Sequence, residues 1–587
     1  MHEKKGLIEE RELINQLEWL RSQIIGRNIS FATPFGWKPL VYADYTASGR
    51  NVRFIENYML HLMQYYANTH TEDDFTGKTM TLLLQAAAKK IKKILNAGET
   101  GKVIFTESGT TGGITRLQQI LGVYWPPATK RRVDEFLESC LQRYPDNDKC
   151  NRELREYIEK KKPIVFVGPY EHHSNEIMWR QTLCEVVEIP LSKTGDLDLI
   201  ALEEAVANPC YASRQKIGSF SAASNVSGIR TPVYDVARIL HRHDAIACFD
   251  FAACAPYIEI DMNRDHESYF DAIFLSPHKF LGGPGTSGLL VINEKIYPRD
   301  LPPCIAAGGT VDFVTPEREK FISDIEIREK PGTPGILQNI KIALIFQLKE
   351  QVGISNIEKI ENFYLQDFYE RFKNNRQIIF YGPTEPAKKV AIIPFNIIHK
   401  DRILHPKFVT RLMNDLFGIQ TRAGCSCAGP YGHRLLNIDK QTSRYYQCLI
   451  ALDNYSGLKP GWVRLNLHYT LSWEEYEYLV RVLDFMTRQA ELFLPLYEFN
   501  LCSGEWYHRD AKKFRTPLDV DLGTALKLKD FTYQPPDNGS ELYQKCLQEA
   551  EEIAANLQPA GKFASFEGML EELMFFYVIN YTKDQDK

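Results

Sequence analysis

The chain contains 587 residues, of which 44% are hydrophobic and 25% are charged, and 70 basic against 75 acidic residues give a formal net charge of −5. These values are close to the averages of soluble globular proteins, so they exclude a mainly disordered chain, and the lack of a basic excess argues against a nucleic-acid partner. Twelve widely spaced cysteines, a charged N-terminus and no apolar stretch of membrane-spanning length predict a reduced cytoplasmic protein without a membrane partner.

The chain opens with a predicted amphipathic helix, because Leu and Ile recur at helical spacing between residues 13 and 24. We assign residues 1–37 to this N-terminal helical segment. From about residue 40, short apolar runs that end in Gly, Ser or Thr alternate with helical stretches. This alternation predicts an α/β fold with a mainly parallel sheet, in which ligands bind beyond the carboxyl ends of the strands.

Two segments interrupt the alternation. Residues 126–162 are rich in charge and are predicted to form an inserted pair of surface helices. The chain becomes irregular after about residue 490 and regains a helical pattern over 540–577, so we expect a C-terminal extension at 491–587.

Lys279 and Asp250 each follow an apolar strand. Lys279 lies in SPHKFLGGPG, directly after DAIFL, and Asp250 ends the strand AIACFD. A surface lysine and a structural ion pair are the ordinary interpretations of such residues. A lysine at a strand end is, however, well placed to be desolvated in a ligand crevice, which makes its amine nucleophilic. A buried acid nearby could hold the pyridinium nitrogen of pyridoxal in its protonated form.

Three further strand ends carry polar side chains. The loop FTESGTTGGIT contains Thr110 and Thr111 and opens a helix, a geometry that suits a phosphate, although it matches neither nucleotide-binding glycine motif. His172, in PYEHHSN, could stack on a planar cofactor or could be an ordinary loop residue. Asn225, in SNVSGI, could reach a ring hydroxyl.

Taken in order, these motifs resemble those of the class V aminotransferase group of fold-type-I pyridoxal-phosphate enzymes, and most closely the cysteine desulfurase and selenocysteine lyase branch. The resemblance covers about residues 38–475. It implies a large cofactor domain at 38–335 with a mainly parallel seven-stranded sheet and a smaller α+β domain at 336–490. It leaves the insertion and the C-terminal extension unmatched.

The resemblance also implies roles for individual residues around pyridoxal 5′-phosphate. Lys279 would form the Schiff base, Asp250 would pair with the ring nitrogen, and His172 would stack on the ring beside Asn225. The phosphate would be held by Thr110, Thr111, Ser276 and His278. In this family a loop of the neighbouring subunit completes the phosphate site, and KPGTPG with Thr333 resembles that loop, so a homodimer is implied.

Substrate-binding roles follow from two more matches. In GWVRLNLHYT, Arg464 falls where the family binds the substrate α-carboxylate, a task that suits a bidentate guanidinium, although a structural arginine is the plain alternative. The segments ADYTAS and ANTH, the latter with Asn68 and His70, resemble those that border the substrate.

The motif TRAGCSCAGP bears on the reaction. Cys427 falls where the desulfurase branch carries its nucleophilic cysteine, and Arg422 could lower the pKa of a nearby thiol. Cys425 could be a second thiol, a resolving partner or merely a small side chain. One departure stands out, since the desulfurase pattern Asp-x-x-Gln is replaced by DFAA, with Ala253 in place of the glutamine.

The sequence therefore predicts an enzyme that converts cysteine or selenocysteine to alanine, with a persulfide on Cys427 and a possible sulfur-acceptor protein. An aminotransferase, epimerase or other pyridoxal-phosphate lyase that does not use Cys427 is the first alternative. A non-catalytic scaffold or sulfur-carrier protein is the second.

Overall fold

The computed structural model describes residues 10–27, 29–69, 71, 73–143, 153, 156–157, 159–510, 520–527, 539–559 and 561–583. The chain divides into two compact units, which we describe separately. Unit 1 contains residues 1–47 and 356–587, and unit 2 contains residues 48–355.

Unit 2 is built on a seven-stranded sheet with the order β4-β10-β9-β8-β7-β5-β6. All strands run in the same direction except β10, which pairs antiparallel with β4 and β9. The prediction of a mainly parallel seven-stranded sheet is thus confirmed. The strands are β4 (Gly101–Thr106), β5 (Ile164–Val167), β6 (Glu185–Glu188), β7 (Lys216–Ser221), β8 (Ala245–Asp250), β9 (Ala272–Leu275) and β10 (Gly288–Asn293).

Helices of unit 2 bury apolar faces against this sheet. Ile114 and Leu117 of α5 pack with Val165, Phe274 and Leu290 of the strands in one hydrophobic core. The helices of the unit are α3 (Arg53–Met63), α4 (Phe75–Ile94), α5 (Gly109–Ile120), α6 (Pro127–Arg143), α8 (Ile177–Arg180), α9 (Leu199–Val206), α10 (Val233–Arg242), α11 (Ile325–Arg328) and α12 (Ile336–Val352).

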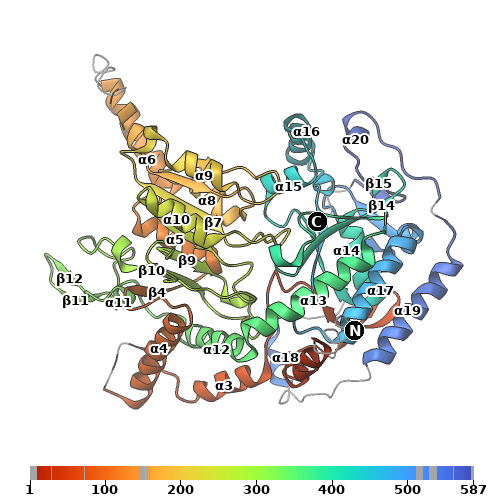
Figure 1. Cartoon of the computed structure of the whole chain (residues 1–587), viewed down its shortest axis with the longest axis horizontal. Helices are drawn as coiled ribbons and strands as arrows, with labels where there is room; N and C mark the ends of the chain where they lie inside the picture. Colours follow the sequence, from red (N-terminus) through yellow and green to blue (C-terminus); the bar gives the residue numbers. More distant parts are fainter. Residues whose placement is uncertain are drawn as a thin grey trace. The chain divides into compact units, whose positions relative to one another are not determined.

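Two parts of unit 2 extend away from its sheet (Figure 1). One is helix α6, which forms the first half of the predicted insertion, whereas much of its second half lies outside the described residues. The other is the hairpin of β11 (Val311–Val314) and β12 (Glu319–Phe321). Phe313 and Val314 on this hairpin are 68% and 58% exposed, an unusual placement for such apolar side chains.

Unit 1 joins the N-terminal residues to the C-terminal part of the chain. Its main sheet has the order β13-β14-β18-β17, with β15 paired to β14, and a second pairing joins β16 to β3. Its strands are β1 (Ser30–Thr33), β2 (Gly36–Pro39), β3 (Val41–Tyr42), β13 (Ile378–Phe380), β14 (Ile392–His399), β15 (Arg402–Ile403), β16 (Ile419–Gln420), β17 (Arg422–Gly424) and β18 (Trp462–Asn466). Its helices up to residue 489 are α2 (Glu18–Ser22), α13 (Ile354–Phe372), α14 (Pro406–Phe417), α15 (Gly429–Leu435), α16 (Lys440–Ala451) and α17 (Trp473–Gln489).

The C-terminal segment packs onto this unit. It contributes a three-stranded sheet of β19 (Tyr497–Asn500), β20 (Trp506–His508) and β21 (Tyr581–Thr582), together with α18 (Leu522–Lys527), α19 (Gly539–Asn556) and α20 (Met569–Glu572). The prediction of helical structure over 540–577 is wrong for most of the segment beyond residue 556, where the described residues form only the short helix α20. Pro559 and two glycines follow α19, and these residues end helices.

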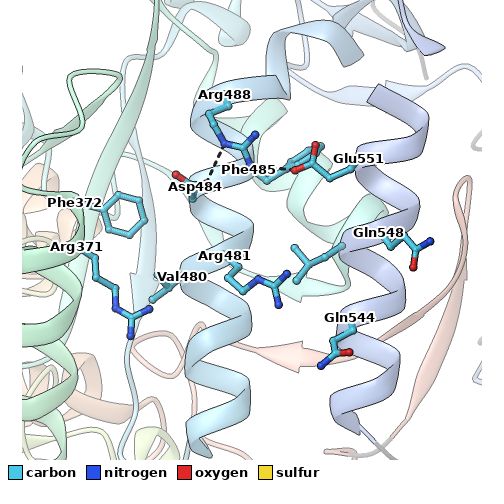
Figure 2. A pocket seen from close by; sticks show the side chains of 11 residues that line it. Arg371, Phe372, Val480, Arg481, Asp484, Phe485, Arg488, Gln544, Gln548 and Glu551 are labelled. Atoms are coloured by element: carbon cyan, nitrogen blue, oxygen red, sulfur yellow. Dashed lines mark hydrogen bonds and ion pairs between the residues drawn. The ribbon is translucent and has the colours of Figure 1, made fainter. Parts of the chain in front are cut away.

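A groove with a volume of about 560 Å³ is lined by residues of α13, α17 and α19, and α19 packs against α17. Figure 2 shows Arg481 extending from α17 toward Gln544 and Gln548 of α19. Arg488 in the same groove is held by Asp484 and Glu551. None of the helices in the described ranges combines the length and apolar character that crossing a bilayer requires.

Candidate active site

The carboxyl ends of the parallel strands of unit 2 carry the polar residues that the sequence analysis selected. The register aligns Ser221 with Asp250 and Asp250 with Phe274, so β7, β8 and β9 end side by side. Ser276 follows β9 directly, and Thr110 follows β4. The sheet therefore brings residues from distant parts of the chain to one edge, as the topology predicts.

The amino end of α5 forms a concave group of donors. The Thr110 backbone N–H donates to Ser276 Oγ at 2.9 Å, and Ser276 Oγ donates to Thr110 Oγ1 at 3.0 Å. Gly109 has φ +57°, and a Cβ there would lie 2.8 Å from Ser276 Oγ, so a larger residue would push the two loops apart. The first turn of this 12-residue helix offers the N–H groups and the dipole that a phosphate requires.

Asp250 lies at the end of β8 and is 4% exposed. Burial raises the pKa of its carboxyl to about 6, although the Ala252 N–H, the charge of Lys279 and the Thr110 side chain each favour the ionised form. The Ala252 N–H donates to Asp250 Oδ1 at 2.8 Å. A cationic ring nitrogen beside this carboxyl would stabilise its ionised form.

Lys279 lies in a short helical turn that contacts with Ser48 and Gly49 hold in place. The Gly49 N–H donates to the His278 carbonyl oxygen at 2.9 Å, and Ser48 Oγ lies 3.2 Å from His278 Nδ1. A Cβ on Gly49 would lie 1.9 Å from the Phe280 carbonyl oxygen, so only glycine permits this close approach. Burial and the charge of Lys279 lower the pKa of His278 to about 4, so this imidazole is neutral at physiological pH.

His172 and Asn225 lie in the loops after β5 and β7. The Ser174 N–H donates to His172 Nδ1 at 3.1 Å, and Ser174 Oγ in turn lies 2.8 Å from Thr111 Oγ1. These contacts connect the loop that carries His172 to the amino end of α5. Asn225 is 8% exposed.

The structure adds Glu171, which the sequence analysis did not select. Glu171 is 3% exposed and accepts hydrogen bonds from the Ser221 N–H and hydroxyl, the Gly168 N–H and Asn175 Nδ2. Burial raises the pKa of Glu171 to about 7. An acid directly before His172 and just beyond a buried strand was the available signal for this residue, which joins the loops after β5 and β7.

The remaining predicted residues of unit 2 are less closely connected to this group. Thr333 lines a cavity of about 510 Å³ together with Ser108, Gly112 and Arg116 at the amino half of α5. Asn68 is exposed, and His70 lies outside the described residues. Ala253 is buried at 6% exposure and offers no hydrogen-bonding group where the desulfurase pattern has glutamine.

In unit 1, Arg464 belongs to a three-residue ion network. Arg464 Nη2 lies 2.9 Å from Asp44 Oδ1, and Arg422 Nε lies 2.8 Å from Asp44 Oδ2. Strands β17 and β18 place Arg422 directly opposite Arg464. Arg464 is 4% exposed, so its charge depends on this carboxylate for compensation.

Cys425 and Cys427 follow β17 directly. Both are exposed, and neither is in a disulfide. The Ala428 N–H donates to the Cys425 carbonyl oxygen at 3.1 Å and closes a four-residue turn. Residues 422–427 thus carry one arginine of the ion network, Arg422 on β17, and both thiols in the turn that follows.

The sheet of unit 2, with an acid and a lysine at strand ends beside the amino end of α5, has the arrangement of an α/β protein that binds pyridoxal phosphate. The family profile described as "Aminotransferase class-V" matches residues 41–130 and 150–451, and the chain belongs to this family of pyridoxal-phosphate-dependent enzymes.

Curated relatives agree with this assignment. The chain is 28% identical over 402 residues to a protein from Halalkalibacterium halodurans named "Probable cysteine desulfurase", which covers 67% of this chain and 85% of the relative. It is 23% identical over 399 residues to the "Cysteine desulfurase" of Klebsiella pneumoniae, with the same coverage.

Solved structures support the fold. The apo cysteine desulfurase from Thermococcus onnurineus matches with a TM-score of 0.59 at 22% identity, covering 76% of this chain and 95% of that one. A cysteine desulfurase from Escherichia coli matches with a TM-score of 0.57 at 17% identity, covering 79% and 97%. Residues beyond 451, including β18, α17 and α19, lie outside the family match.

Proposed function

We propose that the chain is a pyridoxal-phosphate-dependent C–S lyase of the cysteine desulfurase kind, which converts cysteine or selenocysteine to alanine. The observation that carries the proposal is the exposed Cys427 on the turn directly after β17, the strand that pairs with the Arg464 strand. The names of the curated relatives support the same reaction.

The residues of unit 2 fit the cofactor. Gly109, Thr110 and Ser276, which follow β4 and β9, provide hydrogen-bond donors in a confined space that suits a phosphate. The buried carboxyl of Asp250 suits a cationic ring nitrogen. Pyridoxal phosphate, when bound, supplies a sink for the electrons released as a proton leaves the substrate Cα. The proposed cofactor contacts are Thr110, Thr111, His172, Asn225, Asp250, Ser276, His278, Lys279 and Thr333.

The chain's own groups have separate tasks in this proposal. Lys279 would hold the cofactor, and its amine would take the proton from the substrate Cα. Arg464 binds the substrate carboxylate, with Asn68 and His70 at the border of the substrate. The thiolate of Cys427 attacks the substrate sulfur, the bond from Cβ to sulfur breaks, and its electron pair stays with the carbon skeleton. The products are alanine and a persulfide on Cys427.

We also propose a homodimer and a reduced, cytoplasmic setting. Apolar side chains of unit 2 reach the surface on α3, on α4 and on the β11–β12 hairpin, among them Leu60, Met63, Phe75 and Phe313 at 52–70% exposure. A second copy would cover such a surface. Exposed reactive thiols persist where disulfides do not form, and an acceptor protein could take the sulfur there.

The test is product analysis. Purified holoprotein given cysteine should form alanine, with the cysteine sulfur passing to Cys427. A second candidate, an aminotransferase, epimerase or other lyase that needs no thiol, is favoured by Ala253. Transfer of an amino group from substrate to an added keto acid, without alanine formation from cysteine, would support that candidate and contradict the desulfurase proposal.

A further inference from the structure

Cys425 and Cys427 are the only cysteines in the sequence separated by a single residue. They occupy the first and third positions of the turn that the Ala428 N–H closes onto the Cys425 carbonyl. The two central residues, Ser426 and Cys427, have φ of +51° and +55°, in the left-handed region. A four-residue turn with positive φ at both central positions is of the I′ type.

This conformation sets the separation of the two thiols. The distance between the Cα atoms of Cys425 and Cys427 depends on the backbone of Ser426, whose left-handed φ mirrors that of an α-helical residue. Helical radius and rise then give a Cα–Cα distance of about 5.4 Å, against about 7 Å in an extended strand. Disulfides usually join Cα atoms about 4.4–6.8 Å apart, so the Cα separation of this turn lies within the range found in disulfides.

We infer that Cys425 is the resolving thiol of the Cys427 persulfide, so that this chain can release the sulfur as hydrosulfide without an acceptor protein. The inference rests on the proposed function and names the form in which the sulfur leaves. The Cys425 thiolate attacks Cys427 Sγ, a bond forms between the two Sγ atoms, and the bond from Cys427 Sγ to the outer sulfur breaks. The outer sulfur takes the electron pair and leaves as hydrosulfide, so the outer sulfur is reduced and Cys425 is oxidised.

The cycle then requires a reductant, which we assign to the class of dithiols. A disulfide closed across a single residue is strained and exposed here, and such disulfides are more oxidising and more easily reduced than structural ones. One dithiol is oxidised for each hydrosulfide released, and both thiols of the turn are restored. The pair therefore uses a local turn to convert a stored persulfide into a diffusible product.

The test loads the persulfide chemically, so that it does not depend on cysteine turnover. The full-length holoprotein is treated with inorganic polysulfide without oxygen, desalted, and followed by mass spectrometry of the 425–427 peptide and by sulfide release. The wild type should lose the added sulfur as sulfide and form the Cys425–Cys427 disulfide. The Cys425→Ser variant should keep the persulfide at least about tenfold longer, because a neighbouring thiol acts at an effective concentration of millimolar or more.

Controls separate this inference from the proposed function. Cys448→Ser removes another exposed cysteine outside the turn and should behave as the wild type. Cys425→Ala, with the cofactor absorption band as a check of folding, should repeat the result of the serine variant. A persulfide that persists equally in the wild type and in both Cys425 variants would overturn the inference. Failure to form alanine from cysteine would instead contradict the proposed function and leave the polysulfide result standing.

Discussion

The strand-end site of unit 2 and the thiol turn of unit 1 are built in opposite ways. Asp250 and Glu171 are buried, their pKa values are raised by desolvation, and hydrogen bonds from several elements fix their surroundings. Cys427 is exposed, and four consecutive residues define its turn. Holding a charged cofactor requires fixed groups in a low-dielectric setting, whereas passing sulfur onward requires a nucleophile that solvent or a partner can reach.

The largest expected effect concerns the strand-end site. Lys279→Ala should lower alanine formation by about 10³-fold or more, since covalent attachment and proton transfer at Cα are lost together. The measurement is the rate of alanine formation together with the absorption spectrum. Lys193→Ala, which removes an exposed lysine of the same unit, is the matched control and should keep the wild-type rate.

The second prediction concerns the thiol turn of unit 1 and uses Cys427→Ala. We expect alanine formation to fall about 100-fold while the cofactor spectrum stays that of the wild type, because the proposed cofactor contacts all lie in unit 2. Undiminished alanine production in this variant would remove the thiol turn from the reaction. Cys448→Ala is the control for general loss of an exposed thiol.

Arg464→Lys should raise the KM for cysteine about tenfold, equivalent to about 1.4 kcal/mol, because an ammonium group cannot form the paired contacts of a guanidinium. The cofactor spectrum should not change. The control is Arg481→Lys, which makes the same substitution at an exposed position on α17, outside the ion network (Figure 2). It should leave the KM unaltered. An unchanged KM in Arg464→Lys would mean that this arginine serves only the ion pair with Asp44.

The smallest effect is a pH dependence of cofactor binding to the apoprotein. Burial places the pKa of Asp250 at about 6, so below that pH the carboxyl binds a proton and loses the charge that we propose pairs with the ring nitrogen. The affinity of the apoprotein for the cofactor should therefore fall as pH decreases through 6, by up to about tenfold per pH unit. His278 stays neutral over this range, and Glu171 gains a proton near pH 7. Asp250→Asn isolates the contribution of Asp250, and its affinity should be lower at neutral pH and flat between pH 5 and 6.5, within about twofold.

The placement of Lys279, Asp250 and Thr110 at the strand ends could be predicted because each follows its own strand and parallel strands end at one edge. The order of strands in the sheet depends on pairing between distant segments, which local patterns do not encode. The same holds for Asp44, which pairs with arginines 378 and 420 residues further along the chain.

Other features could not be predicted for reasons that differ from one to the next. Left-handed backbone at Ser426 and Cys427 is uncommon for residues other than glycine, so the turn could not be expected from the composition of the loop. The hydrogen bonds of Glu171 join two loops that are 50 residues apart. The helical periodicity over 540–577 was misleading because Pro559 and the following glycines end the helix.

The most direct test of the central claim follows the sulfur atom of cysteine. The holoprotein carrying Cys425→Ser, which should retain a persulfide, is given cysteine labelled in its sulfur, and alanine and the labelled peptide are quantified together. The account predicts alanine and labelled sulfur in equal amounts, with the label on Cys427. Alanine without label on Cys427, or no alanine from a protein that carries its cofactor, would contradict it.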